Sequence, residues 1–333
     1  MNDLATTFDW EKVMTKYFDP KATDNFFNAS TFLEFMRKNA KKRNFGNTWR
    51  ETLEMAEGIG GGYAELEVLD RSRKNIVHYA DWDSGDYYTA MSISWKDQKR
   101  AKSPEEKVDL MKVRSGNAVK TMQRNLTTDM MYGDGTGTAT ASGAENEIVG
   151  LDTIIAEDNT TSAGGIDPAD YTWWVNQYTD IGDGNVTLSD IINMNASCSD
   201  GNVSPDVIAT DKFIKAFIWA NLLQVQERYT TGKFNMAEEL PMVIGIPIVT
   251  DAVFEASSSN GGEGGYGGGY TDGNMFFINK DALFLAINSQ DDMKRWPMER
   301  PIDQFAYSTY WTHEQMLVCN NRRRLGRLFD ITV

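Results

Sequence analysis

Mainly apolar side chains recur at three- and four-residue steps between Ser103 and Gly133, which is the spacing of one face of a helix. The segment opens with a serine suited to cap a helix, a proline at the first helical position and Glu106 three residues after the cap. Gly133 is a natural end. The residues on this face are Val108, Met111, Ser115, Val119, Met122, Leu126 and Met130. The pattern predicts one helix of about 28 residues, roughly 40 Å long.

The opposite face of this predicted helix is basic and carries Lys107, Lys112, Arg114, Lys120 and Arg124. Gly116 lies inside the run, where glycine costs about 1 kcal/mol relative to alanine, and it indicates close packing or a bend. An ordinary globular core also contains amphipathic helices. The helix alone therefore leaves two interpretations open: a core helix, or a rod that is completed by a neighbouring molecule.

Two extended runs precede the helix, Tyr63 to Leu69 and Tyr87 to Trp95, and they predict the strands of a long hairpin. The second run alternates, with Tyr87, Thr89, Met91, Ile93 and Trp95 on one face. A two-stranded arm is marginally stable in water and needs a surface to lie on. We interpret the hairpin as an arm that lies on another copy of the chain; the alternative is that it belongs to the sheet of its own domain.

This interpretation names two sets of residues. The candidates for contact with a neighbouring copy are Tyr63, Leu66, Val77, Tyr79, Trp82, Tyr87, Met91, Ile93 and Trp95. The candidate hinges are Gly58, Gly60, Gly61 and Gly62 at the predicted base of the hairpin, together with Gly116 in the helix. Both sets are hypotheses about assembly rather than about catalysis.

The remaining pattern mixes helices and strands and so predicts an α+β fold. Helices are expected near Ser30 to Lys41, Leu188 to Asn195, after the cap Thr210-Asp211 with Phe213, Phe217 and Trp219-Ala220 on the buried side, and over Asp281 to Ile287. Strands are expected over Asp206 to Ala209, Met242 to Val249, Met275 to Ile278 and Phe305 to Arg323. Glycine-rich loops are expected over 133–147 and 260–274.

Composition narrows the function classes. The chain has 333 residues and a formal net charge of -15, which disfavours strong non-specific binding to nucleic acid or to an anionic membrane. Its longest apolar run, Met242 to Val249, is far shorter than the ~20 residues of a membrane span, so no membrane segment is expected. Cys198 and Cys319 form no CxxC pair, and the first residues do not resemble a secretory signal. A soluble protein in a reducing cytoplasm is expected.

The sequence offers little for catalysis, and we predict no catalytic residue, cofactor or metal. The two histidines, His78 and His313, lie outside nucleophile-elbow and papain-like contexts. No HExxH or CxxC motif occurs, and an EF-hand alignment on Gly184 places Thr179 and Ile181 where carboxylates are required. One alternative remains, a cytoplasmic enzyme in which Asp81, Asp83 and Asp86 hold a divalent metal.

A basic cluster, Arg322-Arg323-Arg324 followed by Arg327, lies at the end of the last predicted strand. Alternate side chains of a strand point to opposite faces. We therefore favour a structural or intersubunit role, with Arg322 and Arg324 as contact residues. Contact with packaged nucleic acid is the alternative.

The order of these parts resembles that of the major capsid (coat) proteins of tailed bacteriophages, a fold shared with encapsulin shells. The likeness covers essentially the whole chain. It is carried by the polar N-terminal arm, the hairpin, the long helix ending in Tyr132-Gly133-Asp134-Gly135-Thr136-Gly137, the turn Val149-Gly150-Leu151-Asp152, the unit Pro205-Asp206-Val207-Ile208-Ala209-Thr210 with its helix, Gly245-Ile246-Pro247-Ile248-Val249, Phe277-Ile278-Asn279 and the strand Tyr307 to Arg324.

The resemblance implies four parts. Residues 1–50 match an N-terminal arm, and 51–102 match an extended loop that lies over an adjacent subunit. Residues 103–150 with 306–333 match a peripheral domain whose spine helix is the long helix above, and 151–305 match an axial domain.

The resemblance also implies partners. Such proteins form hexamers and pentamers that close an icosahedral shell in the host cytoplasm, with a portal protein at one vertex and double-stranded DNA inside. This chain has no long charged scaffolding segment at its start, so a separate scaffolding protein is expected. An encapsulin-like compartment is the related alternative.

Overall fold

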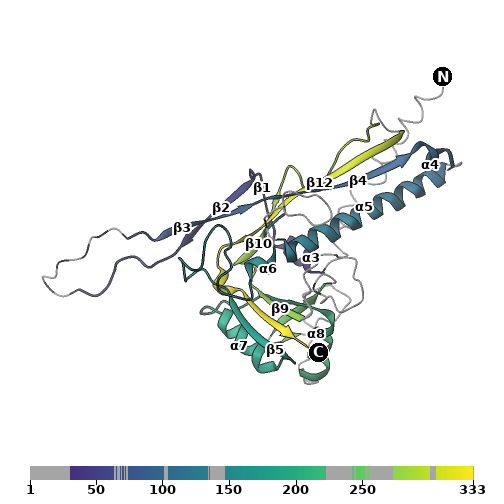
Figure 1. Cartoon of the computed structure of the whole chain (residues 1–333). Helices are drawn as coiled ribbons and strands as arrows, with labels where there is room; N and C mark the ends of the chain where they lie inside the picture. Colours follow the sequence, from purple (N-terminus) through teal and green to yellow (C-terminus); the bar gives the residue numbers. More distant parts are fainter. Residues whose placement is uncertain are drawn as a thin grey trace.

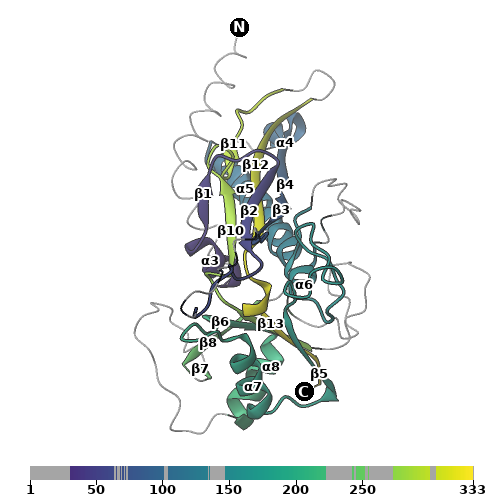
Figure 2. The same cartoon turned by 90° about the vertical axis from the view of Figure 1, so that its left-hand side faces the viewer.

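The computed structural model describes residues 31–332, apart from 64, 66–67, 69, 71, 73, 101–103, 134, 136–146, 223–241, 244, 252–253, 255–272 and 301–304. The molecule is elongated rather than round (Figure 1). A two-stranded arm projects from one end, a long sheet backed by one helix extends the other way, and a second sheet with its own helices lies below (Figures 1 and 2).

The long helix is α5, Pro104–Tyr132, as the sequence predicts. Met111, Met122, Leu126 and Met130 on its apolar face are all almost completely buried. The chain leaves the helix at Gly133, where a Cβ atom would lie 2.6 Å from the carbonyl oxygen of Asp129, so only glycine fits. The capping residue Ser103 and the side chain of Lys107 lie outside the described residues.

The first sheet has the order β1-β10-β12-β11, with β4 on the other edge of β12. Its strands are β1 (Lys41–Arg43), β4 (Gly85–Ser94), β10 (Leu283–Asn288), β11 (Lys294–Arg295) and β12 (Ala306–Cys319). Strand β4 alternates strictly between buried and exposed residues. Its buried face packs against α5, where the Thr89 hydroxyl donates to the Ala118 carbonyl oxygen at 3.2 Å.

This pairing corrects the predicted hairpin. Strand β4 pairs with β12 over its whole length, from Gly85 opposite Gln315 to Ser94 opposite Ala306, and therefore belongs to the core of its own subunit. Trp95 is not in the strand but begins helix α4 (Trp95–Arg100). The predicted alternation matches the burial of β4, whereas its partner strand is β12 and not the predicted hairpin strand. The alternative, a strand in the sheet of its own domain, is the one that holds.

The arm is instead formed by β2 (Thr48–Glu54) and β3 (Val77–Asp83). They pair antiparallel, with Thr48 opposite Asp83 and Glu54 opposite Val77. The described residues from Tyr63 to Asp70 form no strand. The segment that the sequence places in the first strand is thus part of the connection between β2 and β3.

The second sheet has the order β5-β13-β9-β6-β8-β7. Its strands are β5 (Gln177–Gly184), β6 (Val207–Thr210), β7 (Met242–Val243), β8 (Ile246–Thr250), β9 (Gly273–Ile278) and β13 (Gly326–Ile331). Helices α7 (Leu188–Cys198) and α8 (Lys212–Phe217) share its core. Both were expected, and a Thr187–Asp190 capping box begins α7.

Three local predictions for these sheets are wrong. The buried side of α8 is Ile214, continued by Ile218; Phe217 and Trp219 pack against the same core as expected, but Phe213 is 58% exposed. The tract Met242 to Val249 forms two paired strands around Gly245, whose φ of +79° favours glycine, rather than the single strand expected. Residues 281–282 lie in a turn and 283–287 in β10, rather than in a helix; the strand is buried on both faces, so its sequence lacks a diagnostic period.

The chain reaches the first sheet through α3 (Thr31–Lys38), which confirms the predicted N-terminal helix, and α6 (Leu151–Ile154) follows α5. The last strand of the first sheet ends at Cys319, earlier than predicted. A 3-10 turn, Arg322–Arg324, then leads into β13 of the second sheet. Residues 1–30 and most of the two expected glycine-rich loops lie outside the described residues.

Candidate assembly surface

The root of the arm is anchored on its own subunit. Trp82 is 1% exposed and packs against Gly164, where φ is +63° and a Cβ atom would lie only 3.0 Å from the Trp82 ring. The Asp81 amide donates to the carbonyl oxygen of Gly164 at 3.0 Å. These contacts fix the direction in which β2 and β3 leave the body.

Beyond the root, the arm exposes large apolar side chains. The exposed fractions are 51% for Tyr79, 38% for Ile76, 47% for Ile59, 75% for Tyr63 and 92% for Val68. An isolated two-stranded ribbon is marginally stable in water, and clustered exposed apolar residues mark interaction surfaces. The far end of the arm thus has the composition of a contact surface that this chain does not itself cover.

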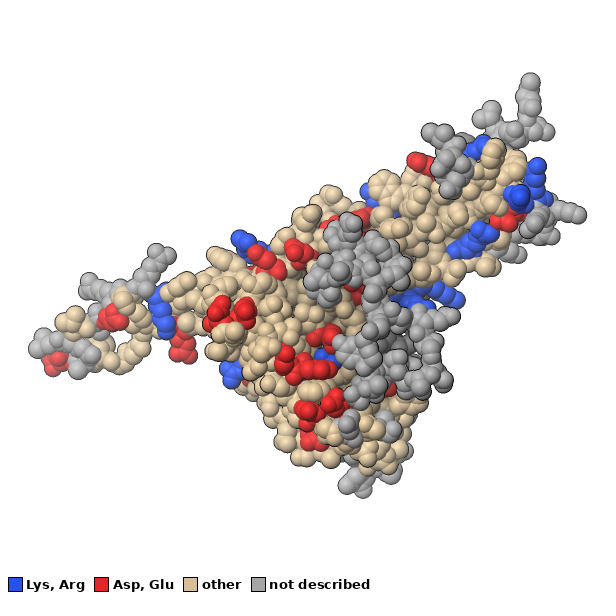
Figure 3. Space-filling model, viewed as in Figure 1, with Lys and Arg blue, Asp and Glu red and all other residues tan. Residues whose placement is uncertain are grey.

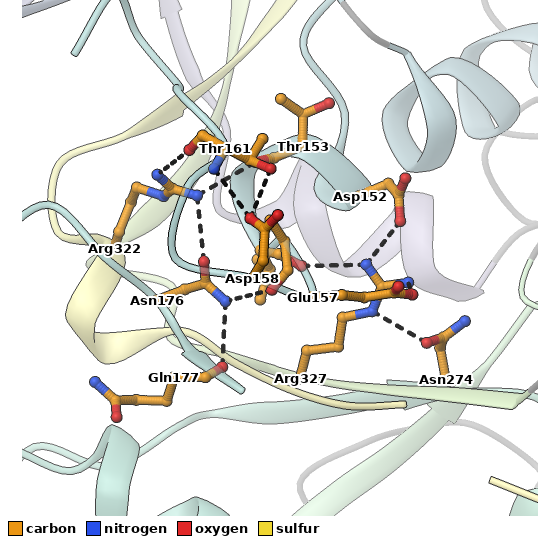
Figure 4. A network of polar contacts seen from close by, with 12 residues as sticks. Asp152, Thr153, Glu157, Asp158, Thr161, Asn176, Gln177, Asn274, Arg322 and Arg327 are labelled. Carbon is orange, nitrogen blue, oxygen red and sulfur yellow. Dashed lines mark hydrogen bonds and ion pairs between the residues drawn. The ribbon is translucent and has the colours of Figure 1, made fainter. Parts of the chain in front are cut away.

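Two buried arginines lie where the chain passes from β12 of the first sheet to β13 of the second (Figure 4). Arg322 is 1% exposed and donates to the carbonyl oxygens of Ile154, Thr161 and Trp174 at 2.9, 2.9 and 3.3 Å. It also donates to the side-chain oxygen of Asn176 at 3.2 Å. Burial lowers the pKa of the Arg322 guanidinium, and nearby Asp158 partly offsets this effect.

Arg327, on β13, makes the carboxylate contacts that Arg322 lacks. It pairs with Asp152 at 2.7 Å and with Glu157 at 2.6 Å, and its guanidinium lies 5.0 Å from the ring centre of Phe276. Both arginines therefore hold the segment 152–176 against the C-terminal strands (Figure 4). Breaking a buried, charge-assisted network of this kind is expensive.

A scan of protein-family models and a sequence search of curated proteins both find no match. Solved structures do match over nearly the whole chain. The capsid of cyanophage A-1(L) is 15% identical, with a TM-score of 0.67, and the alignment covers 91% of this chain and 92% of that one. The capsid of a native GTA particle is 10% identical, with a TM-score of 0.61 and coverages of 89% and 90%.

An encapsulin aligns as well. The SrpI encapsulin of Synechococcus elongatus is 7% identical, with a TM-score of 0.55, and the alignment covers 91% of this chain and 89% of that one. The chain has the fold of tailed-bacteriophage major capsid proteins. The fold class expected from the sequence is therefore confirmed.

Within the capsid fold, the residues expected to contact a neighbour divide into two groups. The exposed or partly exposed ones are Tyr63, Val77, Tyr79, Trp95 and Arg324. The buried ones are Trp82, Tyr87, Met91, Ile93 and Arg322, and for these the expectation is wrong because their own subunit covers them. Leu66 lies outside the described residues.

The candidate hinges occupy positions other than those expected. Gly58, Gly60, Gly61 and Gly62 lie beyond β2, in the connection to β3, rather than at the base of the arm. Gly116 lies on the exposed face of an unbroken helix, and a Cβ atom there would contact nothing within 4 Å, so the expected close packing is absent. That these glycines act as hinges stays a prediction.

Two of the three acidic residues of the enzyme alternative, Asp81 and Asp83, stabilise the arm. Asp81 accepts two hydrogen bonds of 2.7 Å from Arg50, and Asp83 accepts one of 2.7 Å from Thr48, so both link β3 to β2. Asp86 lies on the exposed face of β4. Within the described ranges, no group of three or more His, Cys, Asp and Glu side chains could hold a metal ion. The described helices include none that is long and apolar enough to cross a membrane.

Sequence reasoning missed a polar centre around Asp292, because its members are far apart in the chain. Asp292 accepts hydrogen bonds from Arg37 at 3.0 Å and from Lys42 at 2.5 Å. His313 is buried beside it, with its Nδ1 atom 3.6 Å from Asp292 Oδ1 and its Nε2 atom 3.2 Å from Gln315. The centre joins the N-terminal segment to β12.

His313 predicts a loss of stability in mild acid. Burial, with a further contribution from Arg37, outweighs Asp292 and Asp291 and lowers the pKa of His313 to about 4. The unfolded chain takes up this proton near pH 6.5 and the folded chain only near 4, so unfolding becomes easier as the pH falls between these values, by up to about 3 kcal/mol. Guanidinium unfolding between pH 4.5 and 7 measures the effect.

Two variants test whether His313 causes this pH dependence of stability. His313→Gln cannot take up the proton, so its unfolding midpoint should change much less over this range. His78→Gln, in the partly exposed arm strand, should retain the dependence of the wild type. Parallel pH profiles for wild type and His313→Gln would show that another group is responsible.

Proposed function

We propose that this chain is the major capsid protein of a tailed double-stranded DNA bacteriophage, and that it self-assembles into hexamers and pentamers that form the icosahedral head shell. The observation that carries the proposal is the arm, whose apolar far end is exposed on a subunit with the capsid fold. Its work is to bury surface between copies rather than to turn over a substrate. The expected location is the virion, after assembly in the host cytoplasm.

The arm needs a surface to bind on the next copy. The face of the first sheet that points away from α5 is suited to this role. Tyr88 on β4 is 66% exposed, and Tyr310 on β12 and Trp296 beside it are 44% and 46% exposed. Trp296 is held in place by a 3.1 Å hydrogen bond from its indole nitrogen to Thr312. Aromatic side chains of this kind are typical interface anchors.

The four-part division stays a prediction, with the arm, extended loop, peripheral and axial domains at the boundaries given above. The partners expected are further copies of the chain, a separate scaffolding protein, a portal protein and packaged double-stranded DNA. Shell expansion through hinge motion at Gly58–Gly62 or Gly116 belongs to the same proposal.

Electron microscopy of the purified chain tests the proposal, alone and after co-expression with the neighbouring genes. Closed particles of uniform size with five- and six-fold clusters are the expected result. A chain that stays monomeric in sizing chromatography at high concentration, under both conditions, would refute it.

An encapsulin-like compartment is the second candidate, favoured by the structural likeness to the SrpI encapsulin. Both candidates form shells, so particle formation does not separate them. The contents do: nuclease-protected double-stranded DNA supports a phage head, whereas a co-purifying protein cargo supports a compartment.

A further inference from the structure

The exposed face of helix α5 carries basic residues that the packing of its buried face does not require. Lys112, Gly116, Lys120 and Arg124 recur at four-residue steps and are all exposed. Beside them runs a second exposed row, Val113, Asn117, Thr121 and Asn125. We call Lys112, Lys120 and Arg124, with the polar residues between them, the basic strip.

The charge of this face contrasts with that of the whole chain. Acidic residues make up 48 of the 333, yet none occurs between Asp109 and Asp129. Figure 3 shows Lys and Arg side chains gathered mainly over the half formed by α4 and α5, and Asp and Glu mainly over the lower half. Because the net charge is -15, a polyanion is repelled by most of the surface and attracted here.

Local ion pairs do not account for Lys120 and Arg124 of the strip. Arg114, which lies to one side, donates to Asp97 at 2.7 Å and to the carbonyl oxygen of Ser92 at 2.6 Å. No described salt bridge involves Lys120 or Arg124. Their charges are therefore available to a partner, whereas that of Arg114 stabilises the junction of α4, β4 and α5.

The composition of the strip indicates which partner. Protein interfaces rely on buried aromatic and apolar anchors, and Val113 is the single apolar residue of the two rows. Phosphate contacts use Lys, Arg, Thr and Asn, the residue types present here. At about 1.5 Å per residue, Lys112, Lys120 and Arg124 lie roughly 12 and 6 Å apart along the helix, far enough to reach different phosphates.

We propose that the basic strip of α5 binds the phosphate backbone of double-stranded DNA without reading its sequence. The inference rests on the proposed shell function, and it assigns the face of the subunit that meets the packaged genome. Gly116, with open space above its Cα atom, lets the DNA backbone approach between the two halves of the strip.

The test measures binding of a fluorescent 20-base-pair duplex to the purified full-length chain by anisotropy, over a series of salt concentrations. Each phosphate neutralised contributes about 0.9 to the slope of log affinity against log salt. The double variant Lys120→Gln/Arg124→Gln should lower the magnitude of this slope by up to about 1.8 and weaken binding at low salt. Exchanging the two cations, Lys120→Arg/Arg124→Lys, should preserve the slope.

The matched control removes one lysine and one arginine elsewhere. Lys294→Gln/Arg323→Gln changes the net charge equally at exposed positions outside α5 and should leave the slope near that of the wild type. Equal losses in both double variants, or no binding of the duplex by the wild type at low salt, would overturn the proposal. Polyglutamate serves as a second probe, and binding of it but not of DNA would assign the strip to an acidic protein instead.

Particle formation is scored separately by electron microscopy. The Lys120→Gln/Arg124→Gln chain should form the same particles as the wild type, because the strip has few of the apolar and aromatic anchors on which contacts between copies rely. Absence of particles from the wild type refutes the shell function, whereas unchanged DNA binding by the strip variant refutes the strip alone.

Discussion

Replacing residues 56–75 with Asn-Gly should abolish particle formation and leave a folded, monomeric subunit. The Met55 amide donates to the Ile76 carbonyl oxygen at 2.9 Å, so a two-residue type I′ turn can close the hairpin at this pair. The replacement removes Ile59, Tyr63 and Val68, the exposed apolar end of the arm, but retains β2, β3 and the Trp82 anchor. Sizing chromatography and electron microscopy measure assembly, and circular dichroism measures folding.

Point variants separate the apolar contact from the length of the arm. Tyr63→Ser/Val68→Ser should weaken assembly strongly, because both side chains are exposed on the subunit and would be buried between copies. Glu57→Ser/Lys74→Ser alters two exposed polar residues of the same segment, keeps the net charge and should assemble normally. Normal particles from the shortened arm would refute arm-mediated assembly.

A wider deletion, of residues 64–95, would not be a valid test. It would remove β4, which pairs with β12 along its whole length and covers α5. Loss of particles from that variant would report a subunit that cannot fold. The corrected strand pairing therefore changes the experiment itself.

Arg322→Met should lower the free energy of unfolding by about 3–5 kcal/mol. The substitution leaves the carbonyl oxygens of Ile154, Thr161 and Trp174 buried without their donor. Methionine fills part of the volume but donates no hydrogen bond. Guanidinium unfolding, read from tryptophan fluorescence, gives the change.

Arg323→Met is the matched control for this variant. Arg323 is adjacent in the same turn and exposed, so its replacement should change the free energy of unfolding by no more than about 0.5 kcal/mol. Equal unfolding midpoints for the two variants would contradict a structural role for Arg322. The comparison also decides against Arg322 as an intersubunit contact, since a surface contact would affect assembly and spare the subunit.

Local patterns predicted the elements whose formation depends on neighbours in the chain. The 3.6-residue repeat and the proline-glutamate start predicted α5, and strict alternation predicted which residues of β4 are buried. The Thr187–Asp190 capping box and the Asp211 cap begin α7 and α8 where expected. Such signals act within a few residues, so they are legible in sequence.

Functional residues were predicted less well, because burial depends on partners distant in the chain. An alternating strand shows that one face is covered but not what covers it, and Met91 and Ile93 were assigned to a neighbour although α5 covers them. Arg322 was expected on an extended strand, but Asn321 caps a 3-10 turn and directs it inward. The basic face of α5 was recognised from the sequence, yet its exposure required the structure.

The sequence by itself determined the α+β class, the long helix and the order of parts that resembles capsid proteins, because each follows from local periodicity and capping chemistry. Only the tertiary structure decided that β2 and β3 form the arm, that β4 belongs to the core, and that Arg322 and Arg327 hold the segment 152–176 against the C-terminal strands. These features depend on contacts between residues that lie from 23 positions apart, as for Glu54 and Val77, to 230 positions apart, as for Gly85 and Gln315. Such contacts are set by the burial of the whole chain and leave no local signature.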